Sequence, residues 1–438
     1  MSGLISGSVH ITARPGRGTE RIPTIVSAAL FTVLSLFTIL SCSRPAHIVW
    51  ERRYDAGPGD FGTSVSVDCN DIVVGTTCYD SAAGPGSTAW KFLRSDRNGN
   101  LQWQRSYPRG KHDSLAAIAV GPDHDIVAVG STRPIADGDS VRLLLAKFTA
   151  HGALTWSKEL ALGLVTRGVA LKLDSLGRIT VSGSVRAEGD AATSDMLFAQ
   201  FDSLGNLLDH EALDFGGDEN GQDLIQARAG GFSIRTKLII IAGVRIPLPG
   251  KNDSSTTSDV VVACLDPDHN IVWRDRYDSG GDDLWARLVW NQGPYLVVTS
   301  QTDHGVGTRL LAYGFWYHDV SVLHDTLYSG EPNASCLALT PYRNGGFLGV
   351  GAAGPAGHQH CLGWRFFRGK FETFLSGDDT LGGKDERADA VKTDADGNAV
   401  ISGTSNGGGN SSILLIKVAP PRYIPPPNLP WGTGGGPN

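Results

Sequence analysis

One hairpin recurs along the chain, and this repeat restricts the possible folds more than any other feature of the sequence. Each copy has an alternating strand, a polar turn with Asp, Asn or Gly, and a second strand that ends in Gly and a hydroxyl residue. Clear copies are VSVDCNDIVVGTT (65–77), IAVGPDHDIVAVGST (118–132), LKLDSLGRITVSGS (171–184) and VKTDADGNAVISGT (391–404). The repeat therefore predicts a chain built from many similar β units.

A third, strongly apolar strand follows each hairpin, and a fourth strand often carries Trp. Trp50, Trp103 and Trp156 mark that fourth strand at intervals of 53 residues, and Trp273 follows after 117 residues, which is two units. A unit of four short strands cannot bury both of its faces alone. The sequence thus predicts an all-β, seven-bladed β-propeller over 47–419, with four antiparallel strands in each blade.

The pattern W-x-R-x-Y, followed by D-x-x-G and V-x-G-x-T, resembles bacterial β-propeller repeats of the SBBP or delta-60 type. The resemblance covers about 47–419, although the fifth and sixth units lack the marker Trp. It implies the propeller fold and an exported protein. It implies no particular activity, because propellers serve many functions.

The stretch HIVWERRY (47–54) is a fourth strand that precedes the first complete unit. The last unit has only three strands, and PPRYIPPPNLP (420–430) cannot extend the sheet because Pro lacks a backbone donor. We therefore expect 47–54 to pair with the last blade and close the ring, which also removes an exposed sheet edge.

The first 41 residues have the order of a secretory signal. Arg14, Arg17 and Arg21 precede the uncharged run 22–40, and Cys42 follows. This resembles a bacterial lipoprotein signal, in which Cys42 becomes the lipidated first residue of the mature protein. An uncleaved membrane anchor and simple secretion are the alternatives. All three place the rest of the chain outside the cytoplasm, with 42–46 as a tether and 420–438 as a Pro- and Gly-rich disordered tail.

Charge and cysteine content exclude some functions. The net charge is −7, and it would be −9 without residues 1–41, which carry three Arg and one Glu. Nucleic acids bind clustered Lys and Arg, and the sequence has no such cluster, so we expect no nucleic-acid partner. The cysteines beyond Cys42 are odd in number and include no CxxC, so no disulfide framework is indicated. We expect a monomer.

A polar residue recurs just before the first strand of each blade, on a loop that we expect near the channel mouth. The seven residues are Asp60, Asp113, Thr166, Asn220, Asp283, Asn333 and Glu386. Side chains of this kind often bond nearby backbone N–H groups and fix a loop. The alternative is a ring that binds a polar ligand or a cation such as Ca²⁺.

Several motifs suggest chemistry without supporting it. The segments DADGN (394–398), DRNGN (96–100), DPDHN (266–270) and DSLGN (202–206) lack the Glu of a calcium loop and predict tight turns. In HQHC (358–361), His358 and His360 alternate and could share a metal, but no third fixed ligand is evident. Surface histidines without a metal are the alternative, and the metal assignment stays open. No catalytic motif is present, and no cofactor is predicted.

These features favour a non-enzymatic module of the cell envelope that binds a protein or a glycan. We expect the binding face to be the one that carries the D–A and B–C loops, because Cys42 would hold the opposite face toward the membrane. The alternative is an extracytoplasmic propeller enzyme, such as a lyase, a glycan hydrolase or a quinone-dependent dehydrogenase, with its site at the channel mouth.

Overall fold

The computed structural model describes residues 46–420 apart from short gaps. The longest gaps are 56–60, 135–139, 230–235, 249–255, 303–307, 328–332 and 377–384, and between 291 and 332 only the strand backbone is described. The predicted signal 1–41, Cys42 and the tail 421–438 lie outside the described residues. In the described part of the chain, no helix is long and apolar enough to cross a membrane.

The described residues form β-strands joined by turns and loops, as the alternating pattern predicts. The strands, in chain order, are β1 (His47–Tyr54), β2 (Phe61–Asp68), β3 (Asp71–Tyr79), β4 (Thr88–Asp96), β5 (Leu101–Tyr107), β6 (His112–Val120), β7 (Ile126–Arg133), β8 (Arg142–Phe148), β9 (Leu154–Leu160), β10 (Val165–Leu173), β11 (Ile179–Arg186), β12 (Asp195–Phe201), β13 (Leu207–Leu213), β14 (Asp218–Ala229), β15 (Thr236–Ile246), β16 (Asp259–Leu265), β17 (Ile271–Tyr277), β18 (Asp283–Trp290), β19 (Tyr295–Thr302), β20 (Thr308–Trp316), β21 (Asp319–Leu327), β22 (Ala338–Tyr342), β23 (Gly346–Ala353), β24 (His360–Phe367), β25 (Lys370–Ser376), β26 (Asp385–Thr393), β27 (Ala399–Gly407) and β28 (Asn410–Ala419).

The strands assemble into antiparallel sheets of four. Among the described residues, five four-stranded sheets are separate: β10–β13, β14–β17, β18–β21, β22–β25 and β26–β28 with β1. The strands β2–β5 and β6–β9 form one eight-stranded sheet, because Thr88 of β4 pairs in parallel with His112 of β6. This single pair joins what the sequence predicts as two separate blades.

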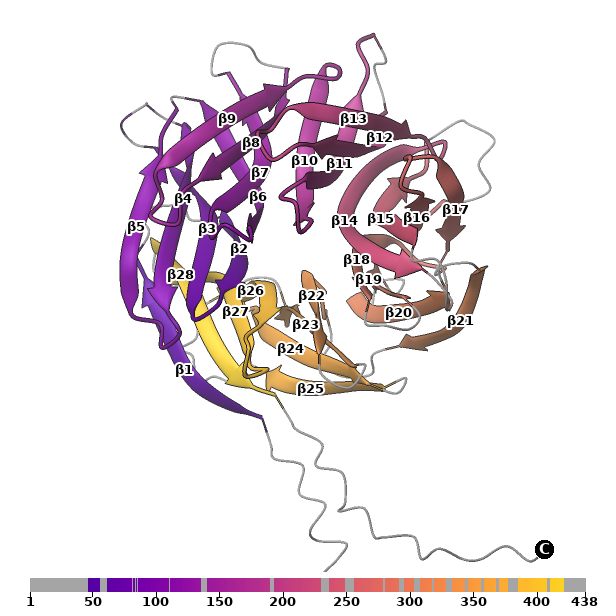
Figure 1. The fold of residues 1–438 in the computed structure, drawn as a ribbon. Coiled ribbons are helices and arrows are strands. Elements are labelled where there is room, and N and C mark those ends of the chain that lie inside the picture. Colours follow the sequence, from indigo (N-terminus) through magenta and orange to yellow (C-terminus); the bar gives the residue numbers. More distant parts are fainter. Residues whose placement is uncertain are drawn as a thin grey trace, which may run out of the picture. The chain divides into compact units, whose positions relative to one another are not determined.

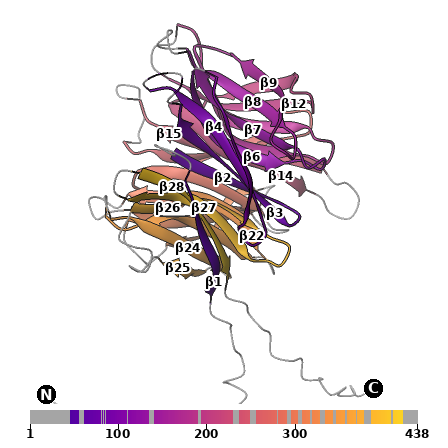
Figure 2. The same ribbon diagram turned by 90° about the vertical axis from the view of Figure 1, so that its left-hand side faces the viewer.

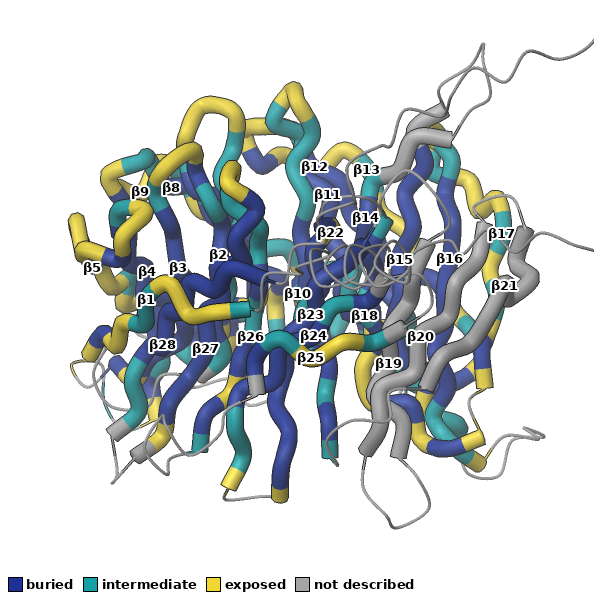
Figure 3. The backbone as a smooth tube through the Cα atoms, turned by 90° about the horizontal axis from the view of Figure 1, so that it is seen from below, coloured by how far each residue is buried: buried dark blue, intermediate teal, exposed yellow. Residues whose placement is uncertain are grey.

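The sheets stand around a central axis with their first strands innermost (Figure 1). Each first strand contacts the next one along the ring, from β2 through β6, β10, β14, β18, β22 and β26 and back to β2. The core lies between neighbouring sheets. Middle strands such as β3 are almost wholly buried, whereas outer strands such as β5 and β9 have only exposed and partly buried residues (Figure 3). The fold is therefore an all-β propeller.

The N-terminal strand β1 pairs antiparallel with β28, with His47 opposite Ala419 and Tyr54 opposite Ile413 (Figure 2). The predicted pairing of 47–54 with the last sheet is confirmed. Tyr54 is buried, and its hydroxyl donates a 2.6 Å hydrogen bond to the carbonyl oxygen of Gly99 in the neighbouring sheet. The two ends of the chain's folded part are thus joined in one ladder.

A β-bulge interrupts the pairing of the first and second strands in several sheets. In β10 it lies between Gly168 and Ala170. It brings the carbonyl oxygen of Arg167 to 1.9 Å from where a Cβ would stand at Gly183 of β11. The equivalent distances at Gly130, Gly243 and Gly403 are 1.9–2.2 Å. The recurring Gly of the second strand is therefore required by the close approach of the backbone.

The Asp-rich segments are turns, as predicted. Asp96 accepts hydrogen bonds from the backbone N–H groups of Asn98 (2.8 Å) and Asn100 (2.9 Å), and Gly99 has a φ of 78°. The same arrangement recurs at Asp202, Asp266 and Asp394. In the turn at Asp266, His269 takes the left-handed conformation with a φ of 64°.

Candidate functional site in the central channel

Most residues of the predicted polar ring are buried between sheets. Asp113, Thr166, Asp283 and Glu386 are each exposed by 2% or less. Asn220 is exposed, and Asn333 is partly exposed with a φ of 56°. Asp60 lies outside the described residues. None of the six described residues lines the channel cavity described below.

These positions join neighbouring sheets through their backbone. The N–H of Thr166 donates to the carbonyl oxygen of Val141 (2.8 Å), and that of Asp283 donates to Ser258 (2.9 Å). Glu386 donates to Gln359 in the same way. The acceptors lie just before the third strand of the preceding sheet. The loop-fixing interpretation of the ring accounts for these contacts.

In the sheet β14–β17, the residue that makes the equivalent backbone contact is Glu219, one residue before the predicted Asn220. The N–H of Glu219 donates to the carbonyl oxygen of Ser194 (2.6 Å), and its carboxylate accepts from the N–H of Gly217 (2.6 Å). Burial raises the pKa of Glu219 to about 7. One oxygen each of Glu219, Asp195 and Asp214 lie within 4.8 Å of one another. The interval of 53 residues that separates Asp113 from Thr166 leads from Thr166 to Glu219, so strict spacing could have found this residue, whereas the predicted Asn220 stands 54 residues on.

The centre of the ring contains a cavity of about 360 Å³. Its wall includes residues of the innermost strands β2, β6, β10, β14, β18, β22 and β26. The residues that bring polar or charged groups or a large aromatic ring to it are Thr63, Ser64, Lys172, Gln222, Asp223, Trp285, Arg287, Arg387, Asp389 and Lys392. A second cavity of about 270 Å³ shares Lys172 and Lys392 with it and also contacts Gln226 and Trp290. Lys172 and Lys392 therefore line both cavities.

Lys172 comes from β10 and Lys392 from β26, on different sides of the ring (Figure 1). The positive charge of Lys172, followed by burial, lowers the pKa of Lys392 to about 7, while Asp223 opposes this shift. Among the described residues, neither ammonium group forms a hydrogen bond or an ion pair within 4 Å. Two like charges in one cavity, neither of them bonded to a carboxylate among the described residues, favour the arrival of an anion.

The other charged groups of the channel are already bonded. Asp389 accepts from the guanidinium of Arg387 and from the N–H of Thr63 (3.1 Å). Asp223 accepts from the N–H of Leu288 (3.0 Å) on the adjacent strand. These two carboxylates tie neighbouring innermost strands together and leave the lysines without a hydrogen-bonded partner.

Arg287 lies beside Trp285, an aromatic residue that remains 38% exposed at the cavity. The guanidinium carbon of Arg287 is 5.7 Å from the ring centroid of Trp285, within range of a cation–π contact. Arg287 also donates to the carbonyl oxygens of Leu337 (2.6 Å) and Gln222 (3.1 Å). The channel thus combines positive charge with an exposed aromatic face.

The sequence contained a signal for the lysines that the ring hypothesis did not use. Lys172 and Lys392 each stand two residues before the turn Asp of the repeated hairpin, in LKLD and VKTD. The equivalent residues of the first two hairpins are Ser66 and Ala119. A structural role common to all blades would place the same type of residue at this position in every unit. A cation in only two units therefore indicates a role that is particular to those two blades.

No protein family model matches the chain, and no curated protein matches it in sequence. The polysaccharide lyase Uly1 is 13% identical, with a TM-score of 0.50 over 83% of this chain and 90% of that one. The β-propeller domain of the Trilobed protease from Pyrococcus furiosus is 8% identical, with a TM-score of 0.43 over 87% and 99%. Trypanosoma rangeli sialidase, in complex with sialic acid, is 9% identical, with a TM-score of 0.45 over 84% and 58%.

At these identities the likeness concerns the fold alone. The likeness to Uly1 and the ring of sheets define the class of the chain, which is that of the β-propellers. What the channel binds must be argued from its own residues.

Proposed function

We propose that the chain is a seven-bladed propeller of the cell envelope that acts as a non-enzymatic binding module for an anionic group of a protein or glycan partner. The observation that carries the proposal is the pair Lys172 and Lys392, which line both channel cavities without a hydrogen bond or an ion pair among the described residues. Seven innermost strands that contact one another in a closed circle support the blade count.

An anion would relieve the repulsion between the two ammonium groups. A carboxylate, sulfate or phosphate group accepts charge-assisted hydrogen bonds from Lys, and such bonds are about twice as strong as neutral ones. The partly enclosed channel strengthens them, because the local dielectric is lower than that of water. Trp285 would contact an apolar or sugar-ring portion of the same ligand.

The proposed location follows from the N-terminus. A lipid on Cys42 would hold the chain five residues before β1, which begins at His47. In this arrangement the face that carries the D–A and B–C loops points away from the membrane and is available to the partner.

The binding proposal can be tested by calorimetric titration of the purified 42–438 chain with sulfate, phosphate and citrate at pH 6. We expect Lys172→Met and Lys392→Met each to weaken binding by about tenfold or more, since a hydrogen bond to a charged group contributes about 1.5–3 kcal/mol. The matched control is Lys158→Met, which removes an exposed lysine of β9.

The pH dependence gives a second readout of the same site. Lys392 loses its charge as the pH rises through about 7, so anion affinity should fall between about pH 6 and 8. Lys392→Met should remove this dependence, whereas Lys158→Met should keep it. Equal affinity for all three variants, or no anion binding by the parent chain, would overturn the proposal.

A second candidate function is an enzyme that acts on an acidic polysaccharide. It is favoured by the pKa of Lys392, because a general base is most effective when its pKa is near the working pH. Incubation with acidic polysaccharides and measurement of the ultraviolet absorbance of an unsaturated product would detect elimination. If the parent chain turns over a polysaccharide, and Lys392→Met abolishes this activity while Lys158→Met keeps it, the enzyme proposal replaces the proposal of a binding module.

A further inference from the structure

A separate cavity of about 190 Å³ lies between the strands β2–β5 and the strands β6–β9. Its wall comes from β4, the end of β5 and the following loop, the start of β6, and β8 and β9. Its volume corresponds to about six water molecules at roughly 30 Å³ each. It is smaller than the sites of roughly 300 Å³ and above that hold drug-sized ligands. The cavity therefore suits a ligand no larger than one small ring.

Several buried polar atoms at this cavity lack a hydrogen-bond partner in the part of the chain that the structure describes. Both carboxylate oxygens of Asp113 lack a partner within 3.5 Å, and Asp113 is only 1% exposed. Burial raises the pKa of Asp113, and the nearby hydroxyl of Thr132 only partly offsets this shift. The others are Nε1 of Trp90, the hydroxyl of Tyr107 and Nη1 of Arg109. Buried polar groups are nearly always bonded, so each of these atoms calls for a partner. The cavity is the space in which that partner would lie.

The partner must offer both donors and acceptors. Asp113 presents acceptor oxygens, whereas Trp90 and Arg109 present only N–H donors, and the hydroxyl of Tyr107 can do either. Asp113 and Arg109 are the only charged residues in the wall, and Oδ2 of Asp113 is 3.9 Å from Nε of Arg109. Arg109 also forms an ion pair with Glu159, which lies outside the wall. The charged groups of the wall therefore have counter-charges within the protein, so the occupant need not carry a charge.

Aromatic rings form another part of the wall. Phe148 and Tyr107 are in contact, with ring centroids 4.3 Å apart, and Phe92 packs behind both of them. Trp90 is almost fully buried and completes the aromatic side. A flat apolar wall that faces several hydrogen-bonding atoms matches the two kinds of surface of a sugar ring, which has C–H faces and hydroxyl edges.

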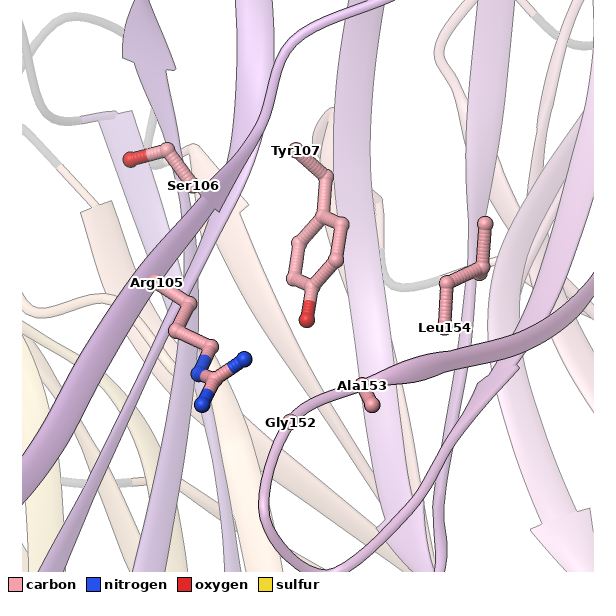
Figure 4. A pocket seen from close by; sticks show the side chains of 6 residues that line it. All are labelled: Arg105, Ser106, Tyr107, Gly152, Ala153 and Leu154. Carbon is pink, nitrogen blue, oxygen red and sulfur yellow. The ribbon is translucent and has the colours of Figure 1, made fainter.

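The cavity adjoins a hollow on the surface, which we take as its proposed entrance. A shallow hollow of about 430 Å³ is lined by Arg105, Ser106, Tyr107, Gly152, Ala153 and Leu154 (Figure 4). Ser106, Tyr107 and Leu154 line both spaces and therefore separate them. Figure 4 shows the side chain of Tyr107 with Arg105 and Ser106 on one side and Leu154 on the other, so rotation of this side chain would alter the boundary between the hollow and the cavity.

We propose that this cavity is a binding site for one neutral monosaccharide unit, independent of the channel. The carboxylate of Asp113 accepts hydrogen bonds from two ligand hydroxyls. Trp90 and Arg109 donate to ligand oxygens, and Tyr107 bonds the hydroxyl nearest the entrance. Of the seven residues that the repeat singles out, Asp113 would thus have a ligand-binding function in addition to its place between sheets.

The test is a calorimetric titration of the 42–438 chain with D-glucose, D-galactose, D-mannose and N-acetyl-D-glucosamine, followed by a crystal structure with the tightest binder. We expect one of these probes to bind. We expect Asp113→Asn and Tyr107→Phe each to weaken binding by about fivefold or more, since one hydrogen bond contributes about 1 kcal/mol or more. Asp268→Asn, on an exposed turn, is the matched control and should bind as the parent does.

Two controls distinguish an effect on folding from an effect on sugar binding. Thermal unfolding of each variant reports its stability, and sulfate titration reports whether the channel site is intact. A variant that keeps its melting temperature and its sulfate binding but loses the sugar supports the site. A crystal structure in which only ordered water bridges Asp113, Tyr107 and Trp90, or equal sugar affinity for Asp113→Asn and Asp268→Asn, overturns it. Binding of an ammonium ligand in place of all four sugars also overturns it.

Discussion

At the scale of single residues, the recurring Gly of the second strand shows how sequence and backbone geometry are linked. The motif V-x-G-x-T could be recognised in the sequence, but its cause could not, because a β-bulge on the neighbouring strand leaves no regular sequence signal. The bulge presses a carbonyl oxygen onto the Gly, and only the absence of a side chain permits the approach.

Gly183→Ala is therefore expected to destabilise the protein by about 1–3 kcal/mol, the usual cost of forcing an extra methyl group into a packed interior. The added Cβ would lie 1.9 Å from the carbonyl oxygen of Arg167, so the bulge must shift. Urea unfolding followed by circular dichroism measures the change. Ser182→Ala in the same strand adds no atom and is the control. An unchanged midpoint for Gly183→Ala would contradict the steric explanation.

The candidate sites show where prediction from sequence stops at this scale. The structure places Asp113, Thr166, Asp283 and Glu386 at the start of innermost strands, and spacing could not show that their side chains are buried between sheets. Lys172 and Lys392 stand far apart in the sequence, and only closure of the ring brings them to one channel. Convergence of this kind depends on tertiary structure.

At the scale of elements, the pairing of β1 with β28 was predictable because two simple observations agreed. The last unit lacked a fourth strand, and the first unit was preceded by an extra one. What the sequence could not show is how β1 is held at its sides. Arg53 forms a 2.7 Å ion pair with the buried Glu386, and Tyr54 bonds the next sheet. The strand is therefore fixed both within its own sheet and to a neighbouring one.

A chain that begins at Asp55 should unfold at a markedly lower urea concentration than the chain that begins at Cys42. It loses the whole β1–β28 ladder and the burial of Tyr54, and it exposes the edge of β28. Addition of a synthetic peptide of residues 46–55 should restore part of the lost stability by mass action. A peptide with the same composition in scrambled order is the control. Unchanged stability of the shortened chain would contradict the closing function of β1.

At the scale of the whole molecule, the repeat predicted a propeller, and the ring of sheets and the structural likeness agree with that class. The sequence could not predict that β4 and β6 share a bridge, because one pair between Thr88 and His112 has no sequence signal. A parallel bridge also joins Val141 to Val165 between the next two sets of strands, so it is the cavity between β2–β5 and β6–β9 that distinguishes these blades from the others.

Anchoring of the full chain by a lipid is a further prediction at this scale. Expression in a bacterium with labelled palmitate should label the parent chain, and Cys42→Ser should abolish the label because it removes the thiol that carries the lipid. Fractionation of membranes and soluble material gives the second measurement. Cys69→Ser, at an exposed cysteine of the propeller, is the control. A label that persists in Cys42→Ser, or is absent from the parent, would rule out the lipoprotein assignment.

The position of the ring's seam has a mechanical consequence. His47 and Ala419 are paired at one end of the β1–β28 ladder, and the chain leaves the propeller at both of these residues. Tension between residues 46 and 420 would act on that pair first and would break the hydrogen bonds one after another, because they run perpendicular to the strands. Such unzipping needs far less force than sliding the strands apart lengthwise. A load carried through the two chain ends would therefore open the ring at this seam before it unfolded any other blade.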